Sequence, residues 1–386
     1  MASLLEEEVE KIVICGAGIV GWSTAYFLTQ LAKKSGRAVK PIVVDRVGTA
    51  ACASGKAAGF LAGNWGNAVT AQLHEEGFKL HRKLAESLGV QSYRDALPTW
   101  AVAPGVPLAS VPKEKLPAGT PDWLDGAVRT AQLMDSDTAQ VLPRELTEKL
   151  MNAAMADGAE LRIGKVEGVY AEGESGNRKV ASVKVDGDSI ACDRVLVALG
   201  PWSVLAEQWF ENLRVPMVGT LGTSSIFKQS AGSVALSALF CEEDDRGRHI
   251  EVFSRPNGEV YCVGGHGGQK VLTAQQLMVL PPEEIEPDAQ DARAARAAFS
   301  SISSIGQGTP PSTLQACVRP CTLDGLPLMG DIPGYDSTAF LACGHSCWGI
   351  LWGPISGLAM AELILLGEST SLDLSAFDVR RTGPRM

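Results

Sequence analysis

The chain has 386 residues, 45% hydrophobic and 20% charged, which is long enough for two domains with a sizeable packed core. Its formal net charge of −10 disfavours nucleic acid and anionic membranes as partners, because either would need a cationic face. Residues 1–11 lack an apolar stretch behind basic residues, and the nine cysteines do not follow the pattern of a small disulfide-bonded domain. We therefore expect a cytoplasmic protein, with an organelle such as the peroxisome or mitochondrion left open.

The first elements read as strand, helix and strand. The apolar run 11–15 (KIVIC) predicts a strand, residues 17–33 have helical spacing, and residues 39–44 form a second apolar run. This order implies two parallel strands joined by a crossover helix. Residues 50–69 read as a loop with a short helix, and residues 69–88 read as a long amphipathic helix.

The middle of the chain is richer in strands. Segment 97–125 contains many prolines and glycines, which predicts irregular structure. Helices are expected at 143–157, 283–305 and 355–366. Single strands are expected at 160–170, 179–185, 248–254, 259–264, 313–320 and 338–343, and a pair of strands is expected over 189–199. Parallel segments at both ends around an antiparallel middle predict a nucleotide-binding domain with a second domain inserted into it.

Residues 337–361 carry no formal charge and are numerous enough to mimic a membrane span. The segment also contains four glycines, a proline, a histidine and three serines. Such a helix would leave backbone groups without partners in lipid. We expect a glycine-rich turn that leads into a buried helix, and no membrane span.

Residues 16–21 (GAGIVG) form a G-x-G-x-x-G sequence directly after the first strand. Gly16 permits a tight turn, Gly18 lets the backbone approach a pyrophosphate, and Gly21 lets the helix pack on the strand. The helix N-terminus offers N–H groups to phosphates. Asp45 ends the second strand, where it can accept hydrogen bonds from ribose hydroxyls. The pattern predicts a dinucleotide site without distinguishing FAD from NAD.

Three further motifs follow in order: 53–59 (ASGKAAG), 195–203 (VLVALGPWS), and 316–330 (ACVRPCTLDGLPLMG) followed by 344–351 (GHSCWGIL). Together with the first, they resemble the D-amino-acid oxidase superfamily, which includes glycine oxidase and sarcosine oxidase. The resemblance covers nearly the whole cofactor-binding half and the middle only loosely. It implies a fold of the α/β class (α+β overall), with a Rossmann-type FAD-binding domain and an inserted antiparallel β-rich substrate domain. The expected FAD-binding segments are 1–69, 145–212 and 314–386, and the substrate segments are 70–144 and 213–313.

The resemblance implies that FAD is the cofactor. The residues that match cofactor-binding positions of the family are Gly16, Ala17, Gly18, Ile19, Val20, Gly21, Asp45, Arg46, Ser54, Gly55, Ala58, Gly59, Val166, Gly200, Trp202, Cys317, Gly344, His345, Ser346, Cys347, Trp348, Gly349 and Ile350. Backbone N–H groups of the 344–350 loop would stabilise the negative charge of reduced flavin. Ala57 stands where the family often has asparagine.

Arg319 matches the arginine that holds the substrate carboxylate in amino-acid oxidases, and a guanidinium suits bidentate carboxylate binding. The alternative is a structural arginine in a salt bridge. Trp348 is expected either to wall the substrate side of the flavin or to belong to the core. Cys317 matches the cysteine that is joined covalently to flavin in sarcosine-oxidase-like members, although relatives with an unlinked cysteine exist.

The leading function is therefore an FAD-dependent oxidoreductase that oxidises the C–N bond of a small amino acid or N-methyl amino acid, with O₂ or another acceptor. One alternative is an FAD-holding assembly protein with little turnover, and another is a dehydrogenase of a hydroxy acid or glycerol phosphate. The cysteines at 317, 321, 343 and 347 lack the usual zinc spacing, so we expect no metal. His249, His266, Arg255 and Lys270 are further polar residues of the expected substrate domain.

Overall fold

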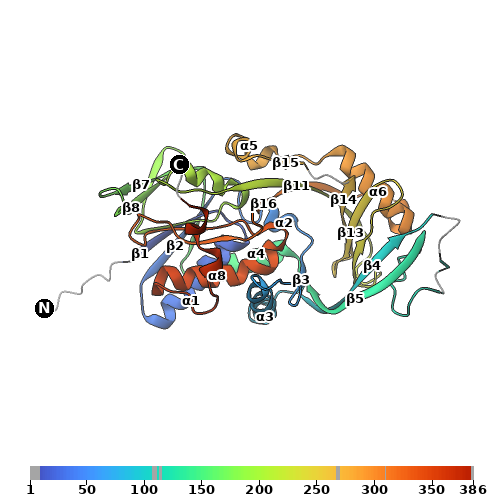
Figure 1. The fold of residues 1–386 in the computed structure, drawn as a ribbon. Helices are drawn as coiled ribbons and strands as arrows, with labels where there is room; N and C mark the ends of the chain where they lie inside the picture. Colours follow the sequence, from blue (N-terminus) through green and yellow to red (C-terminus); the bar gives the residue numbers. More distant parts are fainter. Residues whose placement is uncertain (1–8, 107–110, 113–114, 267–269, 309, 384–386) are drawn as a thin grey trace.

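The chain forms two large sheets that lie side by side, with β11 and β16 running between the two halves (Figure 1). Residues 1–8, over which we expect no secretion signal, lie outside the described part of the chain. The computed structural model describes residues 9–106, 111–112, 115–266, 270–308 and 310–383. This mixed α/β architecture with a second, largely antiparallel sheet confirms the predicted fold class.

A six-stranded sheet holds the predicted parallel unit. β1 is parallel to β2 on one side and to β10 on the other, while β17 is antiparallel at one edge. The apolar sequence of β1 suits a parallel strand that is buried on both faces. In spatial order the strands are β17 (Leu328–Asp331), β18 (Ala339–Cys343), β10 (Arg194–Val197), β1 (Glu10–Cys15), β2 (Val39–Asp45) and β6 (Glu160–Ile163).

Helices cover this half of the molecule, and α1 packs against both α4 and α8 (Figure 1). The longer helices are α1 (Ile19–Ser35), α3 (Ala71–Leu88), α4 (Pro143–Ala156), α6 (Ala289–Ile302) and α8 (Gly349–Leu366). The shorter ones are α2 (Ala53–Lys56), α5 (Ala274–Val279) and α7 (Ser304–Gln307). Stretches of 3₁₀-helix lie at η2 (Gly200–Gln208), η3 (Pro282–Glu284), η4 (Ser346–Trp348), η5 (Ser375–Phe377) and η6 (Val379–Thr382).

Helix α8 explains the uncharged segment noted in the sequence. Among the described residues, Ser346–Leu366 is the stretch that is long and apolar enough to cross a membrane, but 78% of its apolar window is buried inside the protein. A Cβ added to Gly357 would lie 2.3 Å from Cβ of Ser23 on α1, so α1 and α8 approach closely. The helix is thus a core helix, as predicted, and it begins at Gly349 rather than at 355.

The earlier start places a proline inside α8. Pro354 has no N–H and cannot bond the carbonyl of Ile350, one helical turn before it. His81 of α3 takes over this role, because its Nε2 lies 2.8 Å from the Ile350 carbonyl oxygen and donates to it. The His81 side chain is fully buried, and this burial lowers its pKa to about 4. A neutral histidine thus replaces the missing hydrogen bond of the helix.

Replacing His81 by leucine should therefore lower the free energy of unfolding by about 1–3 kcal/mol, because the Ile350 carbonyl would be buried without a donor. Lys83→Leu, an exposed site on the same helix, serves as the control. Chemical denaturation of both variants checks the prediction. Equal stability of the two variants would contradict it.

The second sheet has nine strands and is largely antiparallel. In order along the sheet they are β15 (Val271–Leu272), β11 (Met217–Lys228), β14 (Glu259–His266), β13 (Arg248–Ser254), β12 (Ala238–Cys241), β4 (Arg94–Pro104), β5 (Val128–Gln140) and β3 (Phe60–Ala62), with β16 (Thr313–Thr322) also paired to β11. The prediction of irregular structure over 97–125 is wrong for its first part. β4 forms there because it pairs with β5 on one side and β12 on the other.

Two other predicted elements are divided in the structure. The single strand expected at 160–170 is two strands, since β6 joins the six-stranded sheet and the next strand enters a separate three-stranded sheet. That sheet contains β7 (Val166–Glu172), β8 (Lys179–Val185) and β9 (Asp188–Ala191). The helix expected at 283–305 begins only at Ala289, because the Asp288 carboxylate caps it by accepting from the N–H groups of Gln290 and Asp291.

Candidate active site

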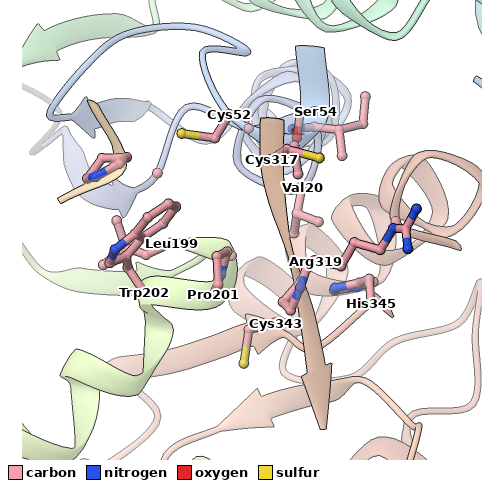
Figure 2. Close-up of a pocket in the computed structure, with 18 of the residues that line it drawn as sticks. Val20, Cys52, Ser54, Leu199, Pro201, Trp202, Cys317, Arg319, Cys343 and His345 are labelled. Atoms are coloured by element: carbon pink, nitrogen blue, oxygen red, sulfur yellow. The ribbon is translucent and has the colours of Figure 1, made fainter. Parts of the chain in front are cut away.

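A cavity of about 740 Å³ lies where the carboxyl ends of β1, β2 and β10 face the nine-stranded sheet (Figure 2). Its volume is in the range of cavities that bind ligands. The predicted site residues that line it are Gly16, Ala17, Gly18, Ile19, Val20, Asp45, Arg46, Ser54, Ala58, Gly59, Val166, Gly200, Trp202, Cys317, Arg319, His345, Ser346, Cys347, Trp348, Gly349 and Ile350. The structure thus brings together four motifs that are far apart in the sequence.

Three predicted residues shape the surrounding loops without lining the cavity: Gly21, Gly55 and Gly344. An added Cβ at Gly21 would lie 1.9 Å from the Gly16 carbonyl oxygen, so only glycine lets α1 pack on the preceding turn. A Cβ at Gly55 would lie 1.9 Å from the carbonyl oxygen of Ala50. Gly344 has φ +81°, a left-handed conformation that favours glycine.

The glycine turn after β1 presents the N-terminus of α1 to the cavity. Gly16 has φ +114°. The hydroxyl of Ser54 accepts a hydrogen bond from the Ile19 N–H at 2.9 Å, which joins the second motif to the first. The Asp45 carboxylate accepts from the Ala17 N–H at 2.9 Å. Each carboxylate oxygen can accept more than one bond, so Asp45 can still receive a ribose hydroxyl.

The ASGKAAG loop is held by two basic side chains. Lys56 donates through Nζ to the Ala316 carbonyl at 2.9 Å, and Arg255 donates through Nη2 to the Ala57 carbonyl at 2.8 Å. The Arg255 guanidinium also pairs with Glu259. Arg255 therefore fixes a loop that lines the cavity, and its side chain is buried rather than exposed at the surface.

The segment that follows α5 borders the nucleotide end of the cavity, next to Asp45. Trp202 donates from its indole N–H to the carbonyl of Leu280 at 2.8 Å. The Arg46 guanidinium pairs with Glu283, and its Nε lies 2.7 Å from a carboxylate oxygen. Residues 277–282 line the cavity beside these contacts. Two predicted cofactor-binding residues thus also anchor a segment that covers the nucleotide end.

At the predicted flavin end, the loop 344–350 leads into α8. His345 is buried, and its Nε2 lies 3.0 Å from the Ser356 hydroxyl. Burial lowers the pKa of His345 to about 4, so this side chain is neutral near pH 7. Gly349 and Ile350, the first residues of α8, line the cavity. Their position brings the positive end of the α8 dipole to the cavity, where it would stabilise an anionic group such as reduced flavin.

The two buried histidines predict a pH dependence of stability. An ordinary histidine has a pKa near 6.5, whereas His81 and His345 have pKa values of about 4 in the folded chain. Between these values the unfolded chain binds more protons, so the free energy of unfolding falls as pH drops from 6.5 to 4. Each histidine contributes up to about 3 kcal/mol to this loss. The loss per pH unit should be smaller in His81→Leu by about 1 kcal/mol, measured by chemical unfolding at pH 6.5, 5.5 and 4.5; parallel pH profiles would contradict this.

The nine-stranded sheet supplies the wall opposite the glycine turn. Cys317 and Arg319 are two positions apart on β16, so they lie on the same face of the strand, and both line the cavity (Figure 2). Cys317 is paired in register with Gly222 of β11. A Cβ added to Gly222 would lie 3.5 Å from Nη2 of Arg319, so the guanidinium passes over this glycine. Arg319 thus reaches the cavity wall, as a carboxylate-binding residue must.

Several aromatic side chains line the same cavity as Arg319. Trp348 lies 6.3 Å from Trp65 between ring centroids, and Phe60 lies 5.3 Å from Phe240. Trp348 lines the cavity and also packs against the hydrophobic core, so the structure is compatible with both of its expected roles. The residues that sequence reasoning missed here are Phe60, Trp65, Phe240, Glu251, Phe253 and Tyr261. Strand alternation puts Glu251 and Phe253 on one face, but only the register decides which face meets the cavity.

Cys317 is partly buried, and desolvation raises the pKa of its thiol while Arg319 and Lys56 act in the opposite direction. A thiol with a raised pKa is protonated at neutral pH. Among the residues that the structure describes, none of the histidine, cysteine and carboxylate side chains form a group of three that could hold a metal. Cys321 instead lies 3.6 Å from the Ser346 hydroxyl.

The other polar residues noted in the sequence lie at separate places. His249 acts electrostatically on Glu251, and His266 acts on Asp291. Lys270 acts on Asp288 at the start of α6. None of His249, His266 and Lys270 is among the residues that line the cavity.

The cavity fits FAD. It runs from the glycine turn at Gly16, past Asp45, to the loop at His345 and the wall residue Arg319. At the turn the backbone of Gly16 packs directly against the backbone of Ala198, because a Cβ on Gly16 would lie 2.3 Å from the Ala198 carbonyl oxygen. One end therefore offers a helix N-terminus and a ribose acceptor, and the other offers a second helix N-terminus.

Comparison with known proteins agrees with this fit. A family model described as FAD dependent oxidoreductase matches residues 11–363. A Schizosaccharomyces pombe protein, named only in general terms as an oxidoreductase, is 26% identical over 403 aligned residues, which cover 95% of this chain and 97% of that protein. Glycine oxidase from Pseudomonas aeruginosa is 26% identical over 92% of this chain and 94% of that protein. The structure of L-proline dehydrogenase from P. horikoshii superposes with a TM-score of 0.74 at 18% identity, over 97% of this chain and 98% of that one, which shows a shared fold.

Proposed function

The chain belongs to the family of FAD-dependent oxidoreductases, and from this premise we propose that it oxidises the C–N bond of a small amino acid or N-methyl amino acid. The bound FAD supplies the hydride acceptor, at N5 of its flavin ring. The proposal is carried by the position of Arg319 in the cavity wall beside the flavin-end loop. Glycine oxidase and L-proline dehydrogenase, two similar proteins, are named for small amino acids, which supports the same substrate class.

Arg319 would bind the substrate carboxylate with two parallel hydrogen bonds and so fix the Cα atom relative to the flavin. The aromatic side chains around it, among them Tyr261 and Trp348, exclude water from the reacting atoms. The flavin-end N–H groups of Gly349 and Ile350 would stabilise the charge that develops on reduction.

The alternatives have less support. An FAD-holding assembly protein with little turnover would need residues that hold FAD and no group for a substrate, whereas here the Arg319 side chain also lines the cavity. A phosphate-bearing substrate should bring a second cation beside Arg319. In the described lining the other cations are Arg46 and Lys165, next to Asp45 and Val166 at the nucleotide end. The charged lining residue that interacts electrostatically with Arg319 is an acid, Glu251.

Product analysis tests the proposal. The FAD-loaded protein is incubated with glycine, L-proline, D-alanine and N-methylglycine in air. The measured products are the 2-oxo acid, the released ammonia, amine or formaldehyde, the cyclic imine in the case of L-proline, and hydrogen peroxide. Equal amounts of oxidised product and peroxide with one of these compounds support C–N oxidation with O₂ as acceptor. If oxidised product forms only when an artificial dye replaces O₂, the natural acceptor is a compound other than O₂. No product with any amino acid under either condition would refute the substrate class. The cytoplasmic location stays a prediction.

A further inference from the structure

Glu251 is an acidic residue at the substrate end of the cavity that the proposed hydride transfer does not use. It lies on β13, in register with Phe240 on one side and Val263 on the other, and all three line the cavity. The lining contains three other acids among the described residues, and all three lie at the nucleotide end: Asp45, which ends β2, Glu167, which follows Val166, and Glu284 of η3. Glu251 is thus placed among the aromatic side chains beside Arg319.

Glu251 is partly buried, and its surroundings contain one strong cation, Arg319. Burial raises the pKa of the Glu251 carboxyl, while Arg319 and His249 lower it. The remaining titratable groups that interact with it are the thiols of Cys241, Cys262 and Cys347. Burial raises the pKa of all three thiols, so they are uncharged near pH 7. The cavity wall therefore carries a guanidinium and a carboxyl group whose proton affinity is increased.

This pair matches an amino acid in its ordinary form. The substrate carboxylate fits the guanidinium of Arg319, and the α-ammonium group has an acceptor in the Glu251 carboxylate. A carboxylate without an amine would fit less well, because it would place a second negative charge near Glu251 in a cavity of low dielectric. Hydride transfer also requires the amine to be neutral, since its lone pair forms the C=N bond as hydride leaves Cα.

We propose that Glu251 removes the proton from the substrate α-ammonium and thereby selects amino acids over amine-free carboxylates. This inference rests on the proposed function. In the step, an N–H bond breaks, the proton forms an O–H bond on the Glu251 carboxylate, and the electron pair stays on nitrogen. Two electrons then leave with the Cα hydrogen as hydride to FAD, the C=N bond forms, and the Glu251 proton later passes to solvent. Glu251 would thus be a catalytic residue as well as a determinant of specificity.

A binding comparison tests the selection without turnover. The FAD-loaded protein is titrated with 2-aminoisobutyrate, which has no α-hydrogen, and with isobutyrate, which lacks the amine, and the flavin visible bands report binding. Wild type should bind 2-aminoisobutyrate at least about tenfold more tightly than isobutyrate. Glu251→Gln should weaken 2-aminoisobutyrate binding by about tenfold or more and should leave isobutyrate binding unchanged or tighter. A wild type without preference for the amine, including one that binds neither probe, would overturn the inference, and so would equal changes for both probes.

A pH profile tests the proton transfer. kcat/KM of Glu251→Gln should fall about 10²-fold at pH 7 and approach wild type as pH rises, because the substrate amine then loses its proton to water. Glu251→Asp keeps a carboxylate and should restore part of the activity at pH 7. Glu242→Gln, at an exposed carboxylate just after β12, is the matched control. Parallel profiles for wild type and Glu251→Gln would overturn the inference while leaving amino-acid oxidation intact. Failure of wild type to oxidise any amino acid would instead refute the proposed function.

Discussion

Replacing Arg319 by methionine should lower kcat/KM for the amino-acid substrate by about 10²- to 10³-fold while FAD stays bound. Loss of one partner of a hydrogen-bonded charge pair in a desolvated site costs about 2–5 kcal/mol, which corresponds to this range. Methionine keeps much of the length of the arginine stem, and Gly222 beneath the guanidinium leaves space for it. The measurement is steady-state kinetics together with the FAD-to-protein ratio from the visible spectrum.

Two controls separate carboxylate binding from general damage. Arg319→Lys keeps the charge and removes the two-pronged geometry, so it should recover only part of the loss. Arg129→Met removes an exposed arginine that pairs with Glu242 at the surface, and should leave the kinetics unchanged. If Arg319→Met binds and oxidises the substrate as wild type does, Arg319 does not hold the carboxylate.

Replacing Gly16 by alanine should produce a protein that purifies largely without FAD. At φ +114° an L side chain is strained, and its Cβ would lie 2.3 Å from the carbonyl oxygen of Ala198 and 2.8 Å from the carbonyl carbon. Both contacts are backbone, so the turn after β1 would have to open, which displaces the α1 N-terminus from the phosphates. We expect at least about 10²-fold weaker FAD binding, because overpacking and left-handed strain each cost about 1–3 kcal/mol.

Gly36→Ala provides a matched control for this effect. Gly36 also has positive φ, at the C-terminus of α1, but an added Cβ there meets no atom within 4 Å. It should cost about 1–2 kcal/mol of stability and retain a full complement of FAD. Retention of FAD by Gly16→Ala at the wild-type ratio would show that this turn does not set cofactor binding.

The cofactor end of the site could be predicted well because its signals are local. The strand at 11–15, the glycine turn and the acid at 45 lie within one βαβ unit, whose parallel pairing follows from the short connection. Glycine is required at Gly16, Gly21 and Gly59 by backbone contacts, and such positions leave a visible pattern in the sequence. The motif residues of this end therefore could be located before the fold was known.

At the substrate end only Arg319 and Trp348 could be predicted, because they belong to sequence motifs of the family. Glu251 and Tyr261 belong to strands that were predicted, but the face they present depends on how β13 and β14 pair with each other and with their neighbours. β5 was missed because its sequence is largely polar and exposed, so it shows no alternation of buried and exposed residues. β4 was missed because it contains two prolines and its burial does not alternate, since its pairing with β5 has several register shifts. In both cases tertiary pairing decided the structure.

The most direct test of the account is the visible spectrum of the purified FAD-loaded protein, recorded without oxygen while D-amino, L-amino and N-methyl amino acids are added in turn. The account predicts that the oxidised-flavin bands disappear with at least one of these classes, and that the same compound fails to bleach Arg319→Met at equal concentration. Admission of air then shows whether O₂ restores the bands. A yellow protein that none of the amino acids bleaches would contradict C–N oxidation, and a protein that cannot be loaded with FAD would contradict the cofactor assignment itself.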